Sequence, residues 1–576
     1  MLFAGSLFAK FLLFNLIWCI QTTFTSFSFV ELYLNMTLAS LILLAPYALG
    51  RLRRVQYILL FVLDAFLVAN LMYSRTYYAA IPLDSYGLAS NLSDFTASVY
   101  DSLRWIDCLF PLSSLACLYA SHKLRQARLS FPSRKAYLAT TGTICILALG
   151  LNALHGGFKQ AYASLQNANY HTCGVPIYTL FGHLYYQALQ GKDQFTPEIG
   201  QQIEQWQAQQ PVYKPLSDTI SIRTNLVVIL CESLESWVLE RTIAGHEITP
   251  CLNKLLKEPT TLYAPQVLTQ VAGGRSIDGQ LLLNAGMLPI QSGSYSMKYP
   301  QNTYFTLTKA LKEAWNARSY LLTVDKSIVW NQGVIAKAFG IDTVLSKPCW
   351  ILDEKVGSRK KLGDESFFRQ TTEKLKRGEI WPEGEPAYLQ CVTYSGHNPF
   401  ILPDELKHIR IEGDYPQRMK DYLTMANYTD HAIQTFINYL KTRSDYNRTL
   451  IVITGDHEGL AGDRAALVQS NGGKGIVSDK FFTPFIVVNS PVGMRYEKVM
   501  GQVDMYTTLL NLLRLDQYPW KGLGQSILDP AKPAFAVSPQ LQLEGSTEGV
   551  STEIVQHAKK AYAISDWMIR YDYLAR

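Results

Sequence analysis

The sequence predicts two parts: an N-terminal bundle of five transmembrane helices, followed by an α/β domain with a mainly parallel central sheet. Long apolar stretches with few charges are concentrated in the first 155 residues, as membrane-spanning helices require. Short apolar runs then alternate with helical stretches such as residues 428–442, which is typical of a parallel sheet covered by helices. The clearest predicted strands are residues 225–231, 387–392, 449–454 and 484–489.

Five apolar stretches make up the predicted membrane bundle. Each is roughly 17–21 residues long, about what the hydrocarbon core of a bilayer requires. A cleaved signal peptide is the alternative for the first stretch, but no small-residue cleavage site follows it and a second apolar stretch begins at once. The stretches lie at residues 8–28, 30–49, 55–73, 104–120 and 137–154.

Basic residues in the loops predict the orientation of this bundle. Because positive loops stay on the cytoplasmic side, we expect the N-terminus inside and everything after about residue 155 outside. The chain is thus expected to be a multi-pass protein of the cytoplasmic membrane with an extracytoplasmic α/β domain. Asp64, in the third stretch, is expected to be neutral and hydrogen-bonded within the bundle rather than to contact a lipid headgroup. The basic residues are Arg51, Arg53 and Arg54, then Lys123, Arg125, Arg128, Arg134 and Lys135.

Composition supports this division and excludes other classes of protein. The chain is 48% hydrophobic and only 17% charged, a high apolar fraction for a fully soluble protein. Its net charge of +6 is spread over the chain without a polybasic run in the outer domain, so nucleic-acid binding is not expected. The nine cysteines show no paired spacing, which argues against a zinc–cysteine site and leaves one disulfide open.

Four segments are expected along the chain. Residues 1–155 form the transmembrane bundle, and residues 156–220 form a connector whose glutamine-rich helix is ended by Pro211. The α/β domain follows at residues 221–530, and residues 531–576 form a C-terminal segment with a terminal helix. Whether the connector lies along the membrane surface or is a plain spacer stays open.

Three short segments of the α/β domain carry side chains that suit metal-assisted phosphoryl transfer. Two predicted strands run directly into Glu232 and Asp456-His457, and Ser276 follows the glycine turn Gly273-Gly274. Ligands bind at the carboxyl ends of strands in open parallel sheets. A carboxylate, an Asp-His pair and a hydroxyl can surround one divalent cation, which polarises a bound phosphate and lowers the pKa of the serine hydroxyl. Ser276 can then be the nucleophile without a histidine base.

The residues beside Ser276 add to this hypothesis. The apolar run after it suits a helix, and a hydroxyl at a helix N-terminus lies where backbone amides favour anionic oxygens. Arg275 is expected to neutralise charge that develops on the phosphoryl oxygens. Each segment alone also fits a structural role, such as a solvated strand end or a flexible loop with an N-cap serine. Their conjunction in one domain favours the functional interpretation.

The three segments resemble those of the alkaline phosphatase/sulfatase superfamily, and most of all those of the lipoteichoic acid synthase and phosphoglycerol transferase family. With the membrane region, the resemblance covers nearly the whole chain and implies an alkaline-phosphatase-like (sulfatase) fold for the α/β domain. Further segments that carry it are Ile248–Asn253, Ser327–Gln332, Gly363–Phe368, Ser395–Phe400 and Ala426–His431.

Carried over residue by residue, the resemblance implies one metal site with Ser276 as nucleophile. The oxygen-rich ligands favour Mn²⁺ or Mg²⁺, and the single histidine leaves Zn²⁺ open. His397 is expected to contact the phosphate or to protonate the leaving oxygen, and Trp330 to line the headgroup pocket. Relatives commonly have threonine in place of Ser276, and either alcohol preserves the chemistry. The implied metal ligands are Glu232, Ser276, Asp456 and His457.

These implications predict a membrane-anchored transferase. Ser276 attacks the headgroup phosphate of a phospholipid, diacylglycerol leaves, and the phosphoserine intermediate passes the headgroup phosphate to a glycolipid, glycan or polymer acceptor. Glycerol phosphate from phosphatidylglycerol is the first expectation. Relatives that handle it often have arginine where this chain has Gln332, which keeps a phosphoethanolamine transferase as the main alternative. A sulfatase-type hydrolase is less favoured because Ser276 is followed by Ile277-Asp278-Gly279, and a non-enzymatic binding module is disfavoured because every expected ligand type is present.

Overall fold

The computed structural model describes residues 2–22, 30–77, 103–125, 132–154 and 194–576, except residues 292, 359, 461 and 462. The chain forms two compact units, Met1–Gln194 and Phe195–Arg576. The second unit therefore contains the α/β domain together with residues 195–220 and the C-terminal segment.

Five long helices are described in the first unit, each overlapping one predicted span. Among the residues that the structure describes there, Arg53–Met72 is long and apolar enough to cross a membrane, while Leu2–Trp18 and Tyr33–Ala48 are shorter apolar helices. The helices are thus where the sequence predicts them, and one of them has the length and composition of a membrane span. They are α1 (Leu2–Thr22), α2 (Val30–Ala48), α3 (Arg53–Tyr77), α6 (Leu109–Arg125) and α7 (Arg134–Leu154).

A buried polar cluster joins three of these helices. Lys10 Nζ on α1 donates to Asp64 Oδ1 on α3 at 2.5 Å and to Ser113 Oγ on α6 at 2.6 Å. Ser114 Oγ donates to the second Asp64 oxygen at 2.5 Å. Asp64 therefore has the internal partners expected of an acid in this position, and one of them is a buried lysine.

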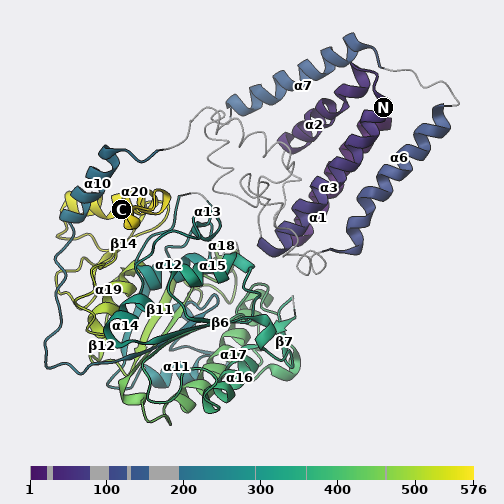
Figure 1. Ribbon diagram of the computed structural model, residues 1–576. Coiled ribbons are helices and arrows are strands. Elements are labelled where there is room, and N and C mark those ends of the chain that lie inside the picture. Colours follow the sequence, from purple (N-terminus) through teal and green to yellow (C-terminus); the bar gives the residue numbers. More distant parts are fainter. Residues whose placement is uncertain are drawn as a thin grey trace. The chain divides into compact units, whose positions relative to one another are not determined.

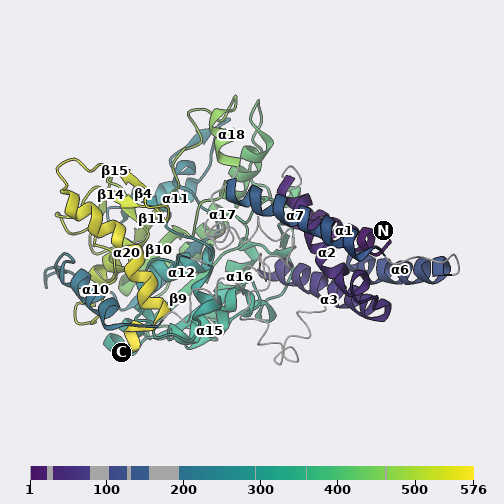
Figure 2. The same cartoon turned by 90° about the horizontal axis from the view of Figure 1, so that it is seen from above.

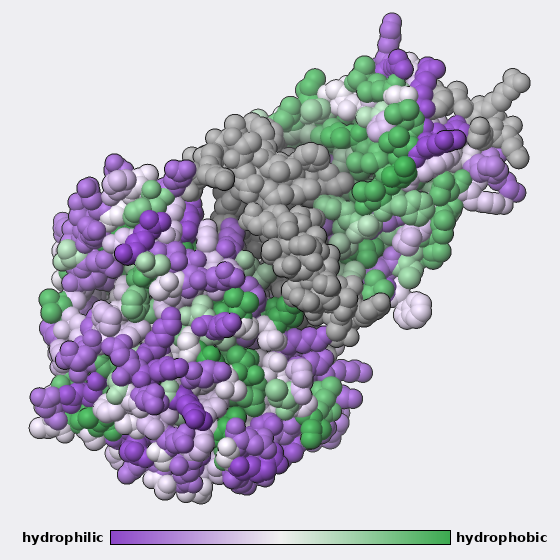
Figure 3. Space-filling view, in the orientation of Figure 1, coloured by the Kyte–Doolittle hydropathy of each residue, from purple (hydrophilic) through white to green (hydrophobic). Residues whose placement is uncertain are grey.

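The outward faces of the first unit's helices are apolar. Ile58, Leu115 and Ile146, on three different helices, are exposed. Figure 3 shows hydrophobic surface along these helices, whereas the visible face of the second unit is mostly hydrophilic. Contiguous exposed apolar surface of this kind is typical of a face that contacts lipid or protein.

A nine-stranded sheet forms the centre of the second unit, with the order β12-β4-β11-β10-β1-β9-β5-β6 and β13 paired to β4. Its two shortest strands are β12 (Met494–Arg495) and β13 (Met500–Gly501). Parallel pairing joins β10 (Thr449–Gly455), β1 (Asn225–Cys231), β9 (Ala387–Val392), β5 (Arg318–Thr323) and β6 (Thr343–Leu345). The mainly parallel sheet is therefore confirmed. The antiparallel exception is β11 (Phe482–Val488), which lies between β10 and β4 (Leu262–Leu268).

The sheet separates two cores because side chains alternate across a strand. Leu226, Val228 and Leu230 of β1 point into a core with α12 (Ser276–Ala285), α14 (Leu307–Trp315) and α19 (Val503–Leu512). Val227, Ile229 and Cys231 point into the other, with α11 (Pro250–Leu255), α16 (Asp364–Lys376) and α17 (Gln417–Leu440). Figure 1 shows these two sets of helices on opposite sides of the sheet. A strand buried on both faces explains the unbroken apolar run of β1.

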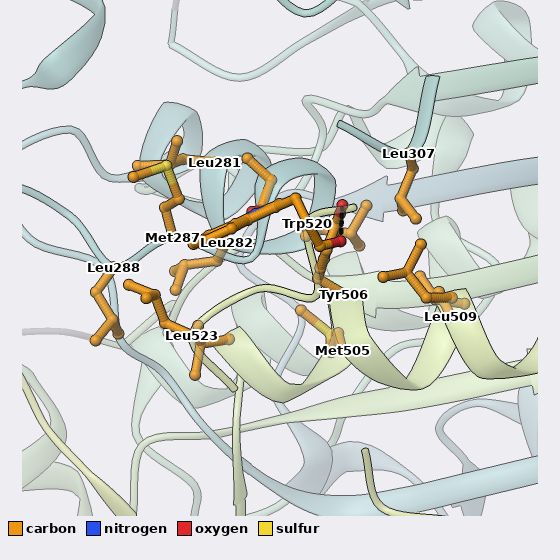
Figure 4. Close-up of a cluster of buried hydrophobic side chains, with 14 of the residues drawn as sticks. Leu281, Leu282, Met287, Leu288, Leu307, Met505, Tyr506, Leu509, Trp520 and Leu523 are labelled. Carbon is orange, nitrogen blue, oxygen red and sulfur yellow. Dashed lines mark hydrogen bonds between the residues drawn. The ribbon is translucent and has the colours of Figure 1, made fainter. Parts of the chain in front are cut away.

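The helix that begins at Ser276 is held firmly by its core. Leu281 and Leu282 of α12 pack near Met505 and Leu509 of α19 (Figure 4). Gly286 ends α12 with φ +60°, and a Cβ there would lie 2.6 Å from the Tyr506 ring, so only glycine fits. Because α12 is fixed at both its apolar face and its end, the position of its first residue is also fixed.

Residues 195–220 and the C-terminal helix lie together on the second unit. The Trp206 ring of α10 (Pro197–Ala208) stacks on His557 of α20 (Thr552–Arg570) with centroids 4.5 Å apart. Trp206 Nε1 also donates to the His557 carbonyl at 3.0 Å. Figures 1 and 2 both show α10 and α20 side by side. The terminal helix thus packs against the helix by which the chain enters the unit.

Candidate metal centre and active site

The three segments singled out from the sequence meet at one edge of the sheet. β1 and β10 are neighbouring parallel strands, with Cys231 paired to Gly455. The next residue of each strand, Glu232 and Asp456, therefore lies at the same carboxyl edge. Ser276 begins α12 at this edge, and its Oγ lies 3.3 Å from Glu232 Oε2 and 3.3 Å from His457 Nε2. The structure brings all four predicted metal ligands together.

The cluster fits a divalent cation. Glu232, Asp456 and His457 each offer a ligand atom, and these atoms lie within 4.8 Å of one another. His457 Nε2 is 3.4 Å from Glu232 Oε1 and 3.5 Å from Asp456 Oδ2. Within the described part of the chain, Asp456 Oδ2 is buried without a hydrogen-bond partner. A buried carboxylate oxygen beside a second carboxylate is costly unless a cation binds both.

Backbone amides hold Asp456 in place. Its Oδ1 accepts hydrogen bonds from Ser233 N and His457 N, each at 2.8 Å. Ser233 adopts φ +59°, which is uncommon for residues other than glycine, and its Oγ donates to Glu232 Oε1 at 2.9 Å. Ser233 therefore orients both carboxylates. This role of Ser233 was not predicted from the sequence, where only its place directly after Glu232 could have indicated it.

The His457 ring is oriented by its neighbour's carbonyl. Nδ1 lies 2.9 Å from Glu458 O, and with the ring proton assigned to Nδ1 it donates this bond and leaves the Nε2 lone pair toward Ser276. Burial lowers the pKa of His457, and the charge of Arg275 lowers it further. The neutral imidazole, which is the form that binds metal, is thereby favoured.

The two carboxylates repel each other when no cation is present. Burial raises the pKa of Glu232 well above its usual range, and the neighbouring charge of Asp456 adds to the rise. The Ser233 hydrogen bond and the charges of Arg275 and Lys361 oppose it. Burial and the charge of Asp456 both oppose ionisation of Glu232. A cation bound between the two carboxylates would offset both effects, so it would strongly favour the ionised form of Glu232.

Arg275 turns toward the Asp-His loop. Its Nη1 pairs with Glu458 Oε1 at 2.5 Å, and its Nη2 donates to Glu458 O at 3.1 Å. Burial raises the pKa of Glu458, but the charge of Arg275 and its hydrogen bond outweigh burial, so the net pKa is lowered. Glu458 was not singled out from the sequence, because its role depends on an arginine far away in the chain.

His397 and Trp330 follow the next two strands of the sheet. His397 comes after β9, its Nδ1 lies 2.7 Å from Asn398 O, and its ring stacks on Tyr394 with centroids 5.3 Å apart. Trp330 lies in the turn η4 (Val329–Asn331) that follows β5. The strand order β10-β1-β9-β5 therefore arranges the Asp-His pair, Glu232, His397 and Trp330 along one edge.

Gln332, at the position where the resemblance implies arginine, is turned inward. It is buried and forms a reciprocal amide pair with Gln280 of α12, with both nitrogen-to-oxygen distances at 3.0 Å. Gln280 Oε1 also accepts from Gln390 Nε2 of β9 at 3.0 Å. The Gln332 side chain thus joins α12 to the sheet.

Comparisons with known proteins agree with this geometry. Residues 224–515, about half of the chain, match the Sulfatase family model. The chain belongs to the sulfatase family. The part that matches the family contains Glu232, Ser276, Asp456 and His457, and the resemblance drawn from the motifs is confirmed by relatives named as lipoteichoic acid synthases.

Two such relatives show how far the likeness to this sulfatase-family chain extends. Lipoteichoic acid synthase 2 of Bacillus subtilis (strain 168) is 29% identical over 311 residues, which cover 53% of this chain and 47% of that protein. Lipoteichoic acid synthase of Staphylococcus saprophyticus is 24% identical over 486 residues, or 81% of this chain and 74% of that protein. The chain thus spans about half of the Bacillus relative and more of the Staphylococcus one.

A solved structure supports the fold of the sulfatase domain. The crystal structure of the lipoteichoic acid synthase LtaP from Listeria monocytogenes matches with a TM-score of 0.51 at 16% identity. The match covers 64% of this chain and 98% of that one. The predicted alkaline-phosphatase-like α/β domain is therefore confirmed.

Proposed function

We propose that this sulfatase-family chain is a membrane-anchored phosphotransferase that moves glycerol phosphate from phosphatidylglycerol to a hydroxyl of a glycolipid, glycan or growing polymer. One observation carries the proposal: Ser276 Oγ lies 3.3 Å from both Glu232 and His457 of the metal-ligand cluster. The names of the relatives, which are lipoteichoic acid synthases, support a phosphotransferase with this class of substrate.

The reaction proceeds in two displacements at phosphorus. Glu232, Ser276, Asp456 and His457 would hold a divalent cation, Mn²⁺ or Mg²⁺ by preference or else Zn²⁺, which when bound would supply Lewis-acid catalysis and lower the pKa of the Ser276 hydroxyl. Ser276 Oγ loses its proton and attacks the phosphorus, the bond from phosphorus to the diacylglycerol oxygen breaks, and that oxygen takes up a proton. An acceptor hydroxyl then loses its proton and attacks the phosphoserine, the bond from Oγ to phosphorus breaks, and Oγ regains a proton.

Neighbouring residues contribute position and charge. Ser276 stands at the N-terminus of α12, where backbone amides favour anionic oxygens. Arg275, beside the nucleophile, neutralises charge on the phosphoryl oxygens while its pair with Glu458 holds it next to His457. His397, on the adjacent strand's loop, contacts the phosphate or gives the proton to the leaving oxygen. Trp330 lines the headgroup pocket.

The proposal includes a multi-pass anchor with the sulfatase domain outside the cytoplasmic membrane. The apolar outward faces of the five described helices support membrane insertion. Arg51, Arg53 and Arg54 and the later basic loop support a cytoplasmic N-terminus. In this arrangement the domains are the bundle at 1–155, the connector at 156–220, the catalytic domain at 221–530 and the C-terminal segment at 531–576.

Transfer of phosphoethanolamine is the second candidate. The inward-turned Gln332 favours it, because this position then places no positive charge in the headgroup pocket. The two candidates share the metal centre and the nucleophile, so only the headgroup left on Ser276 separates them.

Labelled lipids test both candidates. The full chain, in micelles with Mn²⁺, is incubated separately with phosphatidylglycerol and phosphatidylethanolamine that carry labelled headgroups, and mass spectrometry identifies the adduct on Ser276. We expect a glycerophosphate adduct in the wild type and in Ser276→Thr, and none in Ser276→Ala. Undiminished turnover in Ser276→Ala would remove Ser276 as the nucleophile.

A further inference from the structure

Neighbouring strands place residues at increasing distance from the metal ligands along the carboxyl edge of the sheet. β1 carries Glu232, β9 leads to His397, and β5 leads to Asp325. Neighbouring strands are about 4.8 Å apart, so β5 lies roughly 10 Å from β1. This distance matches a phosphate followed by a three-carbon headgroup, so we expect the loop after β5 to face the headgroup.

Asp325, in the loop after β5, has a charged partner. The Lys361 ammonium group pairs with its carboxylate, and the two side chains are 19% and 28% exposed. The Asp325 carbonyl accepts from Lys347 N at 2.8 Å, and its own N–H donates to Thr323 Oγ1 at 3.2 Å, which fixes the backbone. The pair is therefore positioned yet open to a ligand.

Lys361 also contacts the aromatic ring on which His397 stacks. Its Nζ lies 4.2 Å from the centroid of the Tyr394 ring, which stacks on His397. Lys361 comes from the hairpin of β7 (Lys355–Val356) and β8 (Lys361–Leu362). That hairpin lies against Tyr394, because a Cβ at Gly357 would be 3.1 Å from the ring, and Gly357 N donates to Ile401 O at 2.9 Å.

A headgroup beside the loop after β5 would contact Asp325, whose negative charge is balanced by Lys361. Without Lys361, the Asp325 carboxylate would attract the ammonium group of ethanolamine. With Lys361, the net charge of the pair is zero, a cationic headgroup is repelled by the nearby ammonium group, and the hydroxyls of a polyol can donate to the carboxylate and accept from the ammonium group.

We propose that Lys361 is a specificity-determining residue that selects an uncharged polyol headgroup such as glycerol over a cationic one such as ethanolamine. The proposal rests on the proposed function, because it concerns the donor of the same transfer reaction. In this proposal, Lys361 of the β7–β8 hairpin discriminates between glycerol and ethanolamine headgroups. Gln332 does not, because its side chain is turned inward.

Lys361→Met tests the proposal, because methionine keeps the length of the side chain and removes its charge. We would measure kcat/KM of headgroup transfer for phosphatidylglycerol and phosphatidylethanolamine, each in mixed micelles with Mn²⁺, using the full chain. The ratio of the two kcat/KM values is expected to shift toward phosphatidylethanolamine by about tenfold in Lys361→Met. Lys361→Arg keeps the charge and should retain the wild-type ratio.

The matched control is Lys355→Met, which removes an exposed lysine from the facing strand of the same hairpin. It should leave the ratio within about twofold of wild type. A Lys361→Met protein that unfolds at the wild-type temperature and keeps the wild-type ratio overturns the proposal and leaves the proposed function standing. If Lys361→Met does not fold, Lys361→Gln takes its place with the same expected shift. A wild type that forms no headgroup adduct from either lipid overturns the proposed function itself.

Discussion

Glu235 and Arg464 form a buried ion pair that joins the two loops of the metal centre. Arg464 Nη2 lies 2.6 Å from Glu235 Oε2, and both side chains are almost completely buried. Glu235 Oε1 accepts from Gly459 N at 2.7 Å and from Leu460 N at 3.0 Å. The loop that carries Glu232 is thereby tied to the loop that carries Asp456.

Glu235→Gln is expected to destabilise the protein and weaken metal binding together. The substitution leaves the Arg464 charge buried without its partner, which costs about 3 kcal/mol of unfolding free energy. Urea unfolding in micelles and Mn²⁺ titration calorimetry check the two effects. The control is Glu240→Gln, because Glu240 pairs with Arg495 at 2.9 Å in an exposed position where a pair contributes about 1 kcal/mol or less. Equal losses in both variants would contradict the structural role of Glu235.

Asp456→Asn is expected to have opposite effects without and with metal. In the metal-free protein it removes repulsion between two buried carboxylates, so the unfolding free energy should rise by on the order of 1 kcal/mol. Mn²⁺ at about 100 times its Kd should stabilise the wild type by about 2.7 kcal/mol and Asp456→Asn far less. Thermal unfolding with EDTA or Mn²⁺ measures both effects. Asp463→Asn, which changes a half-exposed acid paired with Arg418, should respond to Mn²⁺ as the wild type does.

Arg275→Met is expected to lower kcat more than it changes KM. The variant loses a positive charge beside the nucleophile, an interaction that matters most as charge develops on the phosphoryl oxygens, so a loss of about 100-fold is expected. Arg275→Lys should recover part of the rate. Steady-state transfer of the labelled headgroup gives both constants. If Arg275→Met raised KM alone, Arg275 would act in binding and not in the chemical step.

Asp430 is expected to make stability depend on pH between about 4 and 7. Burial raises its pKa to about 7, although Leu252 N and Cys251 N donate to its oxygens and oppose the shift. The unfolded pKa is about 3.9, so the folded protein holds the extra proton; this stabilisation is full below pH 4 and is lost as pH rises through 7. Asp430→Asn should flatten the slope of unfolding free energy against pH in this window. Asp421→Asn, on the same helix, should keep the wild-type slope.

Strands and helices were predicted well from the sequence where neighbouring residues mark their ends. β1 and β9 were predicted to the residue because their apolar runs are bounded by polar ones. The helix predicted at residues 428–442 begins earlier, at Gln417, because its polar first turns and Pro416 gave no clear start signal. The antiparallel direction of β11 could not be predicted, since pairing partners are not encoded in a strand's own pattern.

The same distinction applies to the site. Glu232, Ser276, Asp456 and His457 could be predicted because each directly follows or begins an element whose end is visible in the sequence. Ser233, Glu235, Glu458 and the proposed role of Lys361 were missed, because they depend on contacts between segments that are distant in the chain, such as Glu235 with Arg464. Such contacts become visible only once the sheet has brought the loops together.

The spacing of ligands along the sheet edge has an evolutionary consequence. The loops with the predicted metal ligands Glu232, Asp456 and His457 follow β1 and β10, whereas the loop that we propose to meet the far end of the headgroup follows β5. Replacements in the β5 loop or the neighbouring hairpin could therefore redirect the enzyme to another donor while its bond-breaking machinery stayed intact. A lineage carrying this scaffold needs few steps to diversify the polymers on its surface.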